Sequence, residues 1–332
     1  MRAHAPAANP HPYDLLSPER VIDAVESLGY LSDYRLLALN SYENRVYQVG
    51  IEQSTPLIAK FYRPGRWSRE AILEEHAFTV ELAEAELPVV APLAIDGSTL
   101  HFDGEFYFAL FTRRGGRAPE LDNLDNLHLL GKLLGRFHAQ GAVRNFVARP
   151  ALSWQEFGRD AVDFVVANAV PAELREAYSS LAEDLLARTE PLLAAAQPDY
   201  LRSHCDCHAG NILWRDERPL FVDFDDARMA PAIQDIWMLL SGSRDEQRRQ
   251  LDEIVDGYEQ FYSFEPRQLA LIEPLRTLRL IHHSAWIGRR WSDPAFPRAF
   301  SWYAQPRYWG DQILTLREQL AALNEPPIAL QG

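Results

Sequence analysis

The stretch His204-Cys205-Asp206-Cys207-His208-Ala209-Gly210-Asn211 decides the fold that we expect for this chain. A second stretch, Val222-Asp223-Phe224-Asp225-Asp226-Ala227, places Asp223 twelve residues after Asn211. Asp206 is a carboxylate that could take a proton from a hydroxyl group, and Asn211 and Asp223 offer the hard oxygen atoms that Mg²⁺ prefers. Phosphoryl transfer needs such groups and little covalent help from the protein. The two stretches together therefore predict phosphoryl-transfer chemistry.

Two short apolar patches lie between the predicted metal ligands. Asn211–Trp214 and Leu220–Val222 flank the polar loop Arg215–Pro219. This pattern predicts a small β-hairpin. Because a hairpin brings its two ends together, we expect Asn211 and Asp223 to lie side by side.

The same residues resemble a known family. His-x-Asp-x-His-x-x-Asn, here His204 to Asn211, is the catalytic-loop signature of the aminoglycoside phosphotransferase and choline kinase group, which are relatives of the protein kinases. The stretch 222–227 is similar to the metal-binding segment of that group. The resemblance implies Asp206 and Asp223 as catalytic residues, Asn211 and Asp223 as Mg²⁺ ligands, and ATP as the phosphate donor.

Candidate nucleotide-binding residues lie upstream. Ile58-Ala59-Lys60-Phe61-Tyr62 is similar to the strand that carries the nucleotide lysine of the family. Glu75 matches the helix glutamate that would pair with Lys60, and Glu74 is the alternative by one position. The resemblance also puts Ser41 in the loop that covers the nucleotide phosphates. Because this loop has no glycine-rich pattern, we expect the side chains of Ser41 and Asn44 to substitute for close backbone contacts.

A closer resemblance, to the bacterial stress response kinase family, covers the chain from about residue 14 to 327. It is carried by four segments: Asn40–Tyr47, Lys60–Pro64, His208–Asp216 and Trp291–Pro297. The resemblance implies a cytoplasmic Ser/Thr protein kinase that acts in a stress response and is itself a phosphoprotein. One residue departs from the family pattern, because Cys205 stands where the family has glycine.

The first third of the chain has the pattern of a sheet with helices. Residues 1–12 predict a disordered tail. Ser17-Pro18 predicts a helix start, with the helix running to Gly29, and a second helix is expected over Ser68–Glu84. Five antiparallel strands are expected at Leu36–Leu39, Arg45–Val49, Leu57–Phe61, Pro92–Ile95 and Phe106–Phe111.

The remainder has mainly helical periodicity, at 127–138, 172–196 and from Ala232 onward. We therefore expect an α+β, protein-kinase-like two-lobed fold. The predicted lobes are 13–112, which binds the nucleotide, and 113–332, which is helical and holds the catalytic and acceptor sites. ATP would bind in the cleft between them, with its adenine against Phe108–Thr112.

The composition of the chain argues against several classes of binding partner. The net charge of −14 argues against nucleic acid as a partner. No apolar run is long enough to span a membrane, and no signal peptide is evident, so we expect a cytoplasmic protein without membrane attachment. Two cysteines two residues apart imply no disulfide framework. No heptad or exposed-strand pattern suggests an oligomer, and we expect a monomer.

Several alternatives remain open at this level. The cluster His204, Cys205, Cys207 and His208 has the residue types of a zinc site, but four ligands within five residues cannot easily surround a metal. Cys205 could act in thiol redox chemistry. Asp225 or Asp226 could assist the metal or a substrate. The aromatic-rich segment Trp286–Trp309 could line a substrate groove, although core packing explains most such rings.

The role of three arginines and the identity of the acceptor also remain open at this level. Arg113, Arg114 and Arg117 flank a glycine pair and could contact phosphates, or they could lie on a solvated hinge. The acceptor hydroxyl could belong to a protein or to a small molecule such as choline, an aminoglycoside or homoserine. A nucleotide-binding scaffold without catalysis is the non-enzymatic alternative.

Overall fold

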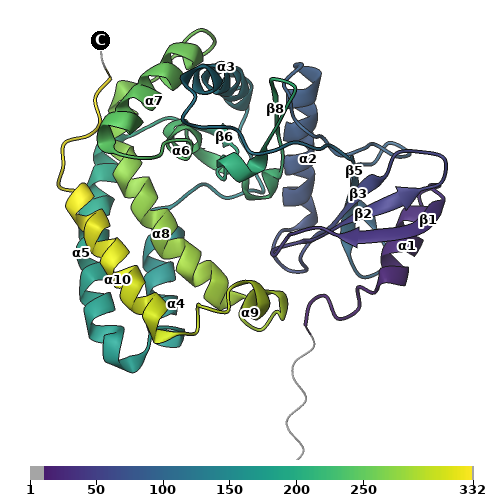
Figure 1. The fold of residues 1–332 in the computed structure, drawn as a ribbon, viewed down its shortest axis with the longest axis horizontal. Coiled ribbons are helices and arrows are strands. Elements are labelled where there is room, and N and C mark those ends of the chain that lie inside the picture. The colour runs from purple at the N-terminus through teal and green to yellow at the C-terminus, as the bar shows by residue number, and fades with distance from the viewer. Residues whose placement is uncertain (1–10, 331–332) are drawn as a thin grey trace, which may run out of the picture. The chain divides into compact units, whose positions relative to one another are not determined.

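The computed structural model describes residues 11–330 (Figure 1). The predicted tail, residues 1–12, lies outside the described residues except for His11 and Pro12. Two compact units divide the chain. Unit 1 comprises Met1–Leu73, Pro92–Arg113 and Arg290–Ala299, and unit 2 comprises Glu74–Ala91, Arg114–Arg289 and Phe300–Gly332. The chain changes unit more than once. Residues 74–91, which fall in the first predicted lobe, belong to unit 2, and residues 290–299, which fall in the second, belong to unit 1.

Unit 1 is built on an antiparallel sheet of five strands in the order β1-β2-β3-β5-β4. The strands are β1 (Ser32–Ala38), β2 (Arg45–Ile51), β3 (Leu57–Phe61), β4 (His101–Phe102) and β5 (Tyr107–Thr112). The predicted number of strands is confirmed, but the strand predicted at Pro92–Ile95 is wrong. That segment makes only isolated bridges, Pro92 to Phe111 and Ile95 to Ser98. Pro92 has no N–H group for a ladder, and the turn at Asp96 and Gly97, both at positive φ, ends the pairing.

Helix α1 (Pro18–Glu26) covers the sheet of unit 1. Its start follows the predicted signal, since the Ser17 side chain accepts a hydrogen bond from the Arg20 N–H at 3.2 Å and Pro18 is the first helical residue. Val21 and Val25 are fully buried, and they belong to one core with Phe61, Phe106 and Phe108 of the sheet. This core fixes the strand that carries Lys60.

Ten residues of unit 1 come from far along the chain. This return segment, Arg290–Ala299, includes the short helix α9 (Ala295–Ala299). Its Asp293, only 1% exposed, accepts two hydrogen bonds from Arg45 Nη2, at 2.7 and 3.0 Å, and is also ion-paired with Arg63 and, at 2.9 Å, with His11. The return segment is thereby anchored beside the loop that contains Ser41 and Asn44.

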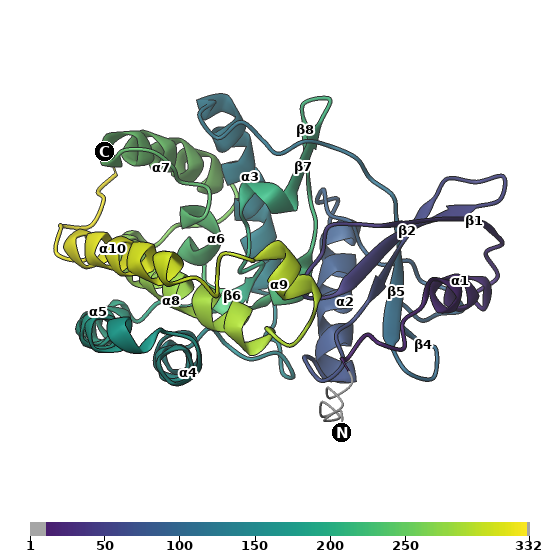
Figure 2. The ribbon, with the colours of Figure 1, turned by 60° about the horizontal axis from the view of Figure 1, so that its bottom comes forward.

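Unit 2 is mainly helical. Its helices are most of α2 (Arg69–Glu84), then α3 (Leu124–Gly141), α4 (Asp160–Asn168), α5 (Arg175–Ala196), α6 (Ile233–Trp237), α7 (Arg244–Tyr258), α8 (Ile272–Arg289) and α10 (Pro306–Ala322). Helix α8 packs against α4, α5 and α10 (Figure 2). None of the helices in the described part of the chain has the length and apolar character of a membrane span.

Two short antiparallel strand pairs lie among these helices. One is β6 (Tyr200–Ser203) with β9 (Arg228–Pro231), which the sequence analysis missed, and the other is the predicted hairpin, β7 (Ile212–Arg215) with β8 (Arg218–Phe221). The β6–β9 pair brackets the catalytic-loop stretch, since β6 ends one residue before His204.

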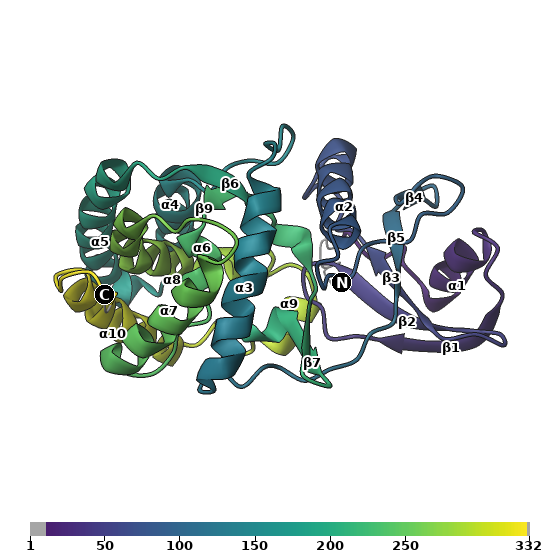
Figure 3. The same cartoon turned by 90° about the horizontal axis from the view of Figure 1, so that it is seen from above.

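Helices α3 and α7 approach closely through glycines (Figure 3). A Cβ atom on Gly131 would lie 2.1 Å from the Ile254 carbonyl oxygen, and one on Gly135 would lie 2.4 Å from that of Tyr258. Only glycine fits at such a backbone approach. This contact holds α3, whose His138 belongs to the candidate site.

Candidate active site

The β7–β8 hairpin joins the two predicted metal ligands, as expected. Ile212 pairs with Phe221, and the Val222 N–H donates to the Asn211 carbonyl oxygen at 3.0 Å. Asp223 directly follows this last bonded pair. Asn211 and Asp223 therefore lie at the same end of the hairpin.

The side chain of Asn211 is held against Asp206. Its Nδ2 atom donates to the Asp206 Oδ2 atom at 3.0 Å and to the Asp206 carbonyl oxygen at 2.9 Å. Both bonds use the amide nitrogen, so the Oδ1 atom of Asn211 is left as a hard oxygen for a cation. Asp206, Asn211 and Asp223 thus form one local constellation, which we call the catalytic loop site.

Arg279 and His208 contact the carboxylate of Asp206. Arg279 Nη2, on α8, lies 2.7 Å from Oδ1, and His208 Nε2 lies 3.5 Å from Oδ2. Burial raises the pKa of Asp206, but the hydrogen bond from His208, the positive charge of Arg279 and the neighbouring rings of His208 and His204 outweigh it and lower the pKa to about 2. The carboxylate is therefore ionised at neutral pH, as acceptance of a proton requires.

Asp223 has an unusual backbone. Its φ and ψ are 60° and 68°, the left-handed region that non-glycine residues adopt rarely and at a cost of about 1 kcal/mol or more. Such strain concentrates at functional positions. The donor set of Asn211 and Asp223 fits Mg²⁺, which is commonly held by one or two protein oxygens together with substrate phosphates.

A zinc site is not supported. In the described part of the chain no group of three or more His, Cys, Asp or Glu side chains is arranged to hold a metal. His204 is fully buried, and its Nε2 atom lies 2.9 Å from the Val222 carbonyl oxygen, so its ring links the two stretches of the site. His208 caps the following turn by accepting the Gly210 N–H at 2.9 Å through Nδ1. Both histidines thus have scaffold contacts.

Asp235, on α6, binds the backbone of the loop that carries Asp206, and the sequence analysis missed this residue. This fully buried carboxylate accepts the N–H groups of His204 at 2.9 Å and Cys205 at 2.7 Å. His138 Nε2 lies 3.1 Å from Oδ2, and its Nδ1 atom lies 2.9 Å from the Tyr258 hydroxyl. No local sequence signal marks Asp235, because its partners are 30 or more residues away.

Cys205 is buried at a φ of 64°. Glycine, which the resemblance leads us to expect at this position, would adopt that region without penalty. Burial, followed by the negative charge of Asp235, raises the pKa of the Cys205 thiol well above its ordinary value. A protonated, buried thiol is a poor nucleophile, so the structure gives no support to the redox alternative.

Glu74 and Glu75 have different partners. Glu74 accepts three backbone N–H groups, from residues 147, 148 and 149, at 2.7 to 3.0 Å. Glu75 is buried and pairs with Arg149 Nη2 at 2.8 Å, while Arg149 Nη1 donates to the carbonyl oxygens of Asp225 and Ala227. Arg149, also missed by the sequence analysis, therefore links Glu75 to the backbone that follows Asp223.

The remaining candidates belong to unit 1. Lys60 is buried, lies in β3 opposite Val46 and Ala109, and has its Nζ atom 4.9 Å from the Tyr62 ring centroid. The Ser41 hydroxyl donates to the Asn44 carbonyl oxygen at 3.1 Å, which closes the predicted phosphate loop. Because Lys60 and Glu75 belong to different units, their pairing stays a prediction.

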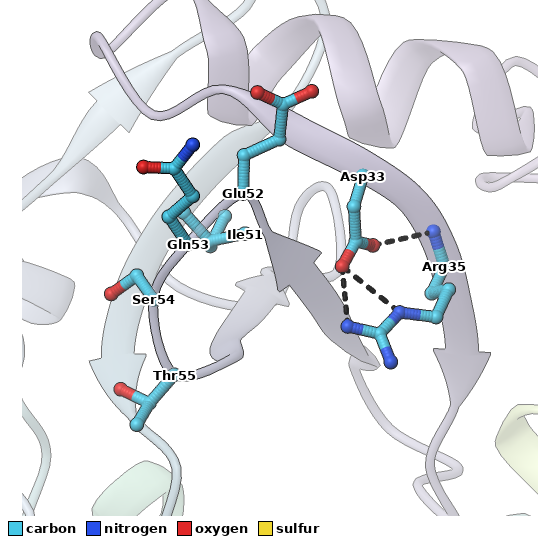
Figure 4. A pocket seen from close by; sticks show the side chains of 7 residues that line it. All are labelled: Asp33, Arg35, Ile51, Glu52, Gln53, Ser54 and Thr55. Carbon is cyan, nitrogen blue, oxygen red and sulfur yellow. Dashed lines mark hydrogen bonds and ion pairs between the residues drawn. The ribbon is translucent and has the colours of Figure 1, made fainter.

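A separate hollow lies between the start of β1 and the β2–β3 turn (Figure 4). Its lining includes Asp33 and Arg35, whose side chains pair with each other at 2.9 Å (Nε to Oδ2). None of the candidate site residues lines it. We do not assign this hollow to the catalytic loop site.

Comparison with known proteins gives consistent matches. The phosphotransferase enzyme family matches residues 35–272. Stress response kinase A of Escherichia coli K12 is 45% identical over 321 residues, which cover 96% of this chain and 97% of that protein. The serine/threonine protein kinase RdoA of Salmonella typhimurium LT2 is 45% identical over 329 residues, covering 97% and 98%.

Solved structures show the same fold at low sequence identity. An amicoumacin kinase, solved with AMP-PNP, Ca²⁺ and Ami, has a TM-score of 0.69 at 19% identity and covers 90% of this chain and 91% of its own. A microcompartment-associated aminopropanol kinase has a TM-score of 0.65 at 19% identity, covering 91% and 98%. The predicted kinase-like α+β fold is confirmed.

Proposed function

Because this chain belongs to the phosphotransferase enzyme family, and within it to the stress response kinases, we propose that it transfers the γ-phosphoryl group of ATP to the hydroxyl of a protein serine or threonine, with Mg²⁺ as cofactor. Membership supports a kinase. The protein acceptor, ATP and Mg²⁺ are the finer parts of the proposal. A relative at 45% identity is named a serine/threonine protein kinase, which supports a protein hydroxyl as the acceptor.

The observation that carries the proposal is the hydrogen-bonded pair Asp206 and Asn211 next to Asp223. Asp206 is ionised and 22% exposed, so it can meet an acceptor hydroxyl and take its proton. Asn211 and Asp223 would hold Mg²⁺. When bound, the ion would neutralise charge on the phosphates during transfer.

Unit 1 would supply the nucleotide contacts. Lys60 would contact the phosphates of ATP, with Glu75 as its predicted partner, and the loop from Ser41 to Asn44 would cover them. Within unit 1 the loop is stabilised by the Ser41 bond and by the Arg63 N–H, which donates to Asn44 Oδ1 at 3.0 Å. A preformed loop reduces the entropy cost of binding.

The experiment compares Asp206→Asn with the wild type in γ-labelled ATP and Mg²⁺, with a generic protein acceptor and with a panel of small alcohols. We expect turnover to fall by about 10²- to 10⁴-fold while ATP affinity is kept. Asp216→Asn is the matched control, because Asp216 is 86% exposed in the same hairpin. Unchanged turnover in Asp206→Asn would contradict the assignment of the base.

The acceptor panel separates the alternatives. Label on protein, including the chain itself, supports the protein-kinase function. Label found only on a small alcohol would show that the acceptor is a small molecule and not a protein, while phosphoryl transfer itself would still be supported. Bound ATP without any transfer, to water included, would leave a non-catalytic scaffold.

A further inference from the structure

One cation stands directly beside the proposed base. Arg279, on α8, puts Nη2 2.7 Å from Asp206 Oδ1, and its side chain is 41% exposed. The other oxygen, Oδ2, accepts Asn211 Nδ2 at 3.0 Å and lies 3.5 Å from His208. A hydroxyl group that binds at Oδ1 therefore has Arg279 as a neighbour. Whatever is attached to that hydroxyl lies within reach of the guanidinium group.

Arg279 has donors to spare. A guanidinium group carries five N–H donors in a planar fork that suits carboxylates. Within residues 11–330, the ion pair with Asp206 is the one polar contact found for this side chain. An ion pair with a partly exposed arginine adds little to folding stability. Anchoring of α8 is thus a weak explanation for a cation at this place.

Aromatic rings continue the surface along α8 and beyond it. His283, one turn after Arg279, has its pKa lowered by loss of water and by the charge of Arg279, while the charge of Asp206 opposes this, so both groups are its neighbours. His283 stacks on Trp286, Trp286 meets Phe300 edge-on, and Phe300 meets Trp302. Successive ring centroids are 5.6 to 5.8 Å apart, and those of His283 and Phe300 are also only 6.5 Å apart, so the first three rings form a compact triangle from which Trp302 extends. We call these four side chains the aromatic row.

The aromatic row is long enough for a short peptide segment. An extended chain advances about 3.3 Å per residue, so the two steps from His283 to Phe300 and on to Trp302, of 6.5 and 5.8 Å, match at most about four residues of peptide. Trp302, at the far end, is 40% exposed. Aromatic and arginine side chains are the residues that most often carry binding energy in protein interfaces. A small alcohol would use only the first ring.

We propose that Arg279 and the aromatic row form the acceptor site of this kinase, and that Arg279 selects a serine or threonine flanked by carboxylate side chains in a polypeptide. The proposal rests on the proposed function, since it needs Asp206 as the base. Arg279 contacts the carboxylate next to the acceptor residue. The row binds the segment that continues from it.

The chemistry of Arg279 favours an anionic acceptor side chain. Asp206 offsets part of the charge of Arg279, but the N–H donors of Arg279 that the ion pair leaves unused match a carboxylate and cannot bind an ammonium group. The net charge of −14 would repel an acidic peptide. That repulsion is screened over about 8 Å at physiological salt, whereas direct contact with Arg279 is not. Local charge therefore determines the preference.

The test uses the full chain with Mg²⁺ and ATP and two peptides that each contain one serine. One peptide has glutamate, and the other lysine, at the two positions on each side of the serine. We expect wild-type kcat/KM to favour the glutamate peptide by at least about tenfold, the value of one charge-assisted contact. Arg279→Gln should abolish the preference, and Arg279→Glu should reverse it.

The control is Arg317→Glu, an equal change of charge on the exposed side of α10, which should keep the wild-type preference. If Arg279 only holds Asp206 in place, its variants will slow both peptides equally, and the proposal is then overturned. It is overturned too if free L-serine or choline is a better acceptor than the glutamate peptide, because that indicates a small-molecule site.

A binding measurement separates this proposal from the proposed function. A fluorescent glutamate peptide with alanine in place of serine is titrated by anisotropy, without catalysis. Loss of at least about tenfold in affinity in Arg279→Glu supports the acceptor site. Equal affinity in both proteins overturns it, whatever the turnover. If the peptide binds with dependence on Arg279 but the wild type transfers no phosphoryl group from ATP, the proposed function alone is overturned.

Discussion

Replacing Asp235 by alanine tests how the catalytic loop is held. Three N–H groups would lose their acceptor, those of His204, Cys205 and the His138 ring, all of them buried. A buried donor without a partner costs about 1 to 3 kcal/mol. Release of the buried carboxylate itself offsets part of this. We therefore expect a net loss of about 3 to 6 kcal/mol, a large share of the 5 to 15 kcal/mol that typically stabilises a domain.

Asp235→Asn is the milder change. The amide keeps one oxygen but turns an NH₂ group toward an N–H donor, so we expect a loss of about 2 to 4 kcal/mol. Urea unfolding followed by circular dichroism measures the free energy of unfolding. Because the two units can unfold separately, hydrogen–deuterium exchange of the peptide containing His204 to Asn211 adds a local measurement. Turnover should fall by about 10²-fold, as the loop carrying Asp206 is displaced.

The control for this prediction is Asp184→Asn, on the exposed side of α5. It removes an equal charge, and we expect a change of less than about 0.5 kcal/mol. The reasoning is refuted if Asp235→Asn unfolds within that same margin of the wild type and its loop exchanges no faster.

Further predictions address strain, packing and charge. Cys205→Gly should keep turnover and change stability by less than about 1 kcal/mol, because relief of the positive φ offsets the lost thiol burial, whereas Cys205→Val should cost about 2 kcal/mol or more in urea unfolding. Gly131→Ala should destabilise by about 2 kcal/mol or more despite the better helix propensity of alanine, while Gly310→Ala, whose Cβ meets nothing within 4 Å, should stabilise by about 0.5 to 1 kcal/mol; thermal unfolding of the pair gives opposite signs if this is right. Asp293→Asn should destabilise unit 1 by about 2 to 4 kcal/mol, since it leaves two partly buried arginines beside a neutral group, and faster hydrogen exchange confined to unit 1 would identify the effect.

The part of the site within one short stretch could be predicted from sequence. A hairpin whose strands have their own local signal joins Asn211 to Asp223, as expected, and the structure adds a hydrogen bond from Asn211 to Asp206. Periodicity also located most helices, because an amphipathic face is a local property. The prediction of a strand at Pro92–Ile95 was wrong. It relied on the apolar residues of the segment and gave too little weight to Pro92, which has no N–H group to donate to a neighbouring strand.

The supporting residues could not be predicted. Asp235, Arg149 and Arg279 each act on a segment 30 or more residues away, and a lone charged residue in a helical pattern is most often solvated. Only the fold reveals that the buried Asp235 accepts two backbone N–H groups, or that Arg279 pairs with Asp206. The Lys60–Glu75 pair stays a prediction for the same reason, since it joins two units.

The return segment has a consequence for biosynthesis. A ribosome makes the five strands of unit 1 within the first 112 residues, but the carboxylate that balances Arg45 and Arg63 arrives only at residue 293. During most of translation Arg45 would lack this carboxylate partner, whereas Arg63 could still pair with Glu43, which lies 3.0 Å from it. Nascent chains stalled just before and just after the return segment should therefore differ in protease resistance of the first 112 residues. A segment made long after the five strands would then complete the unit to which they belong.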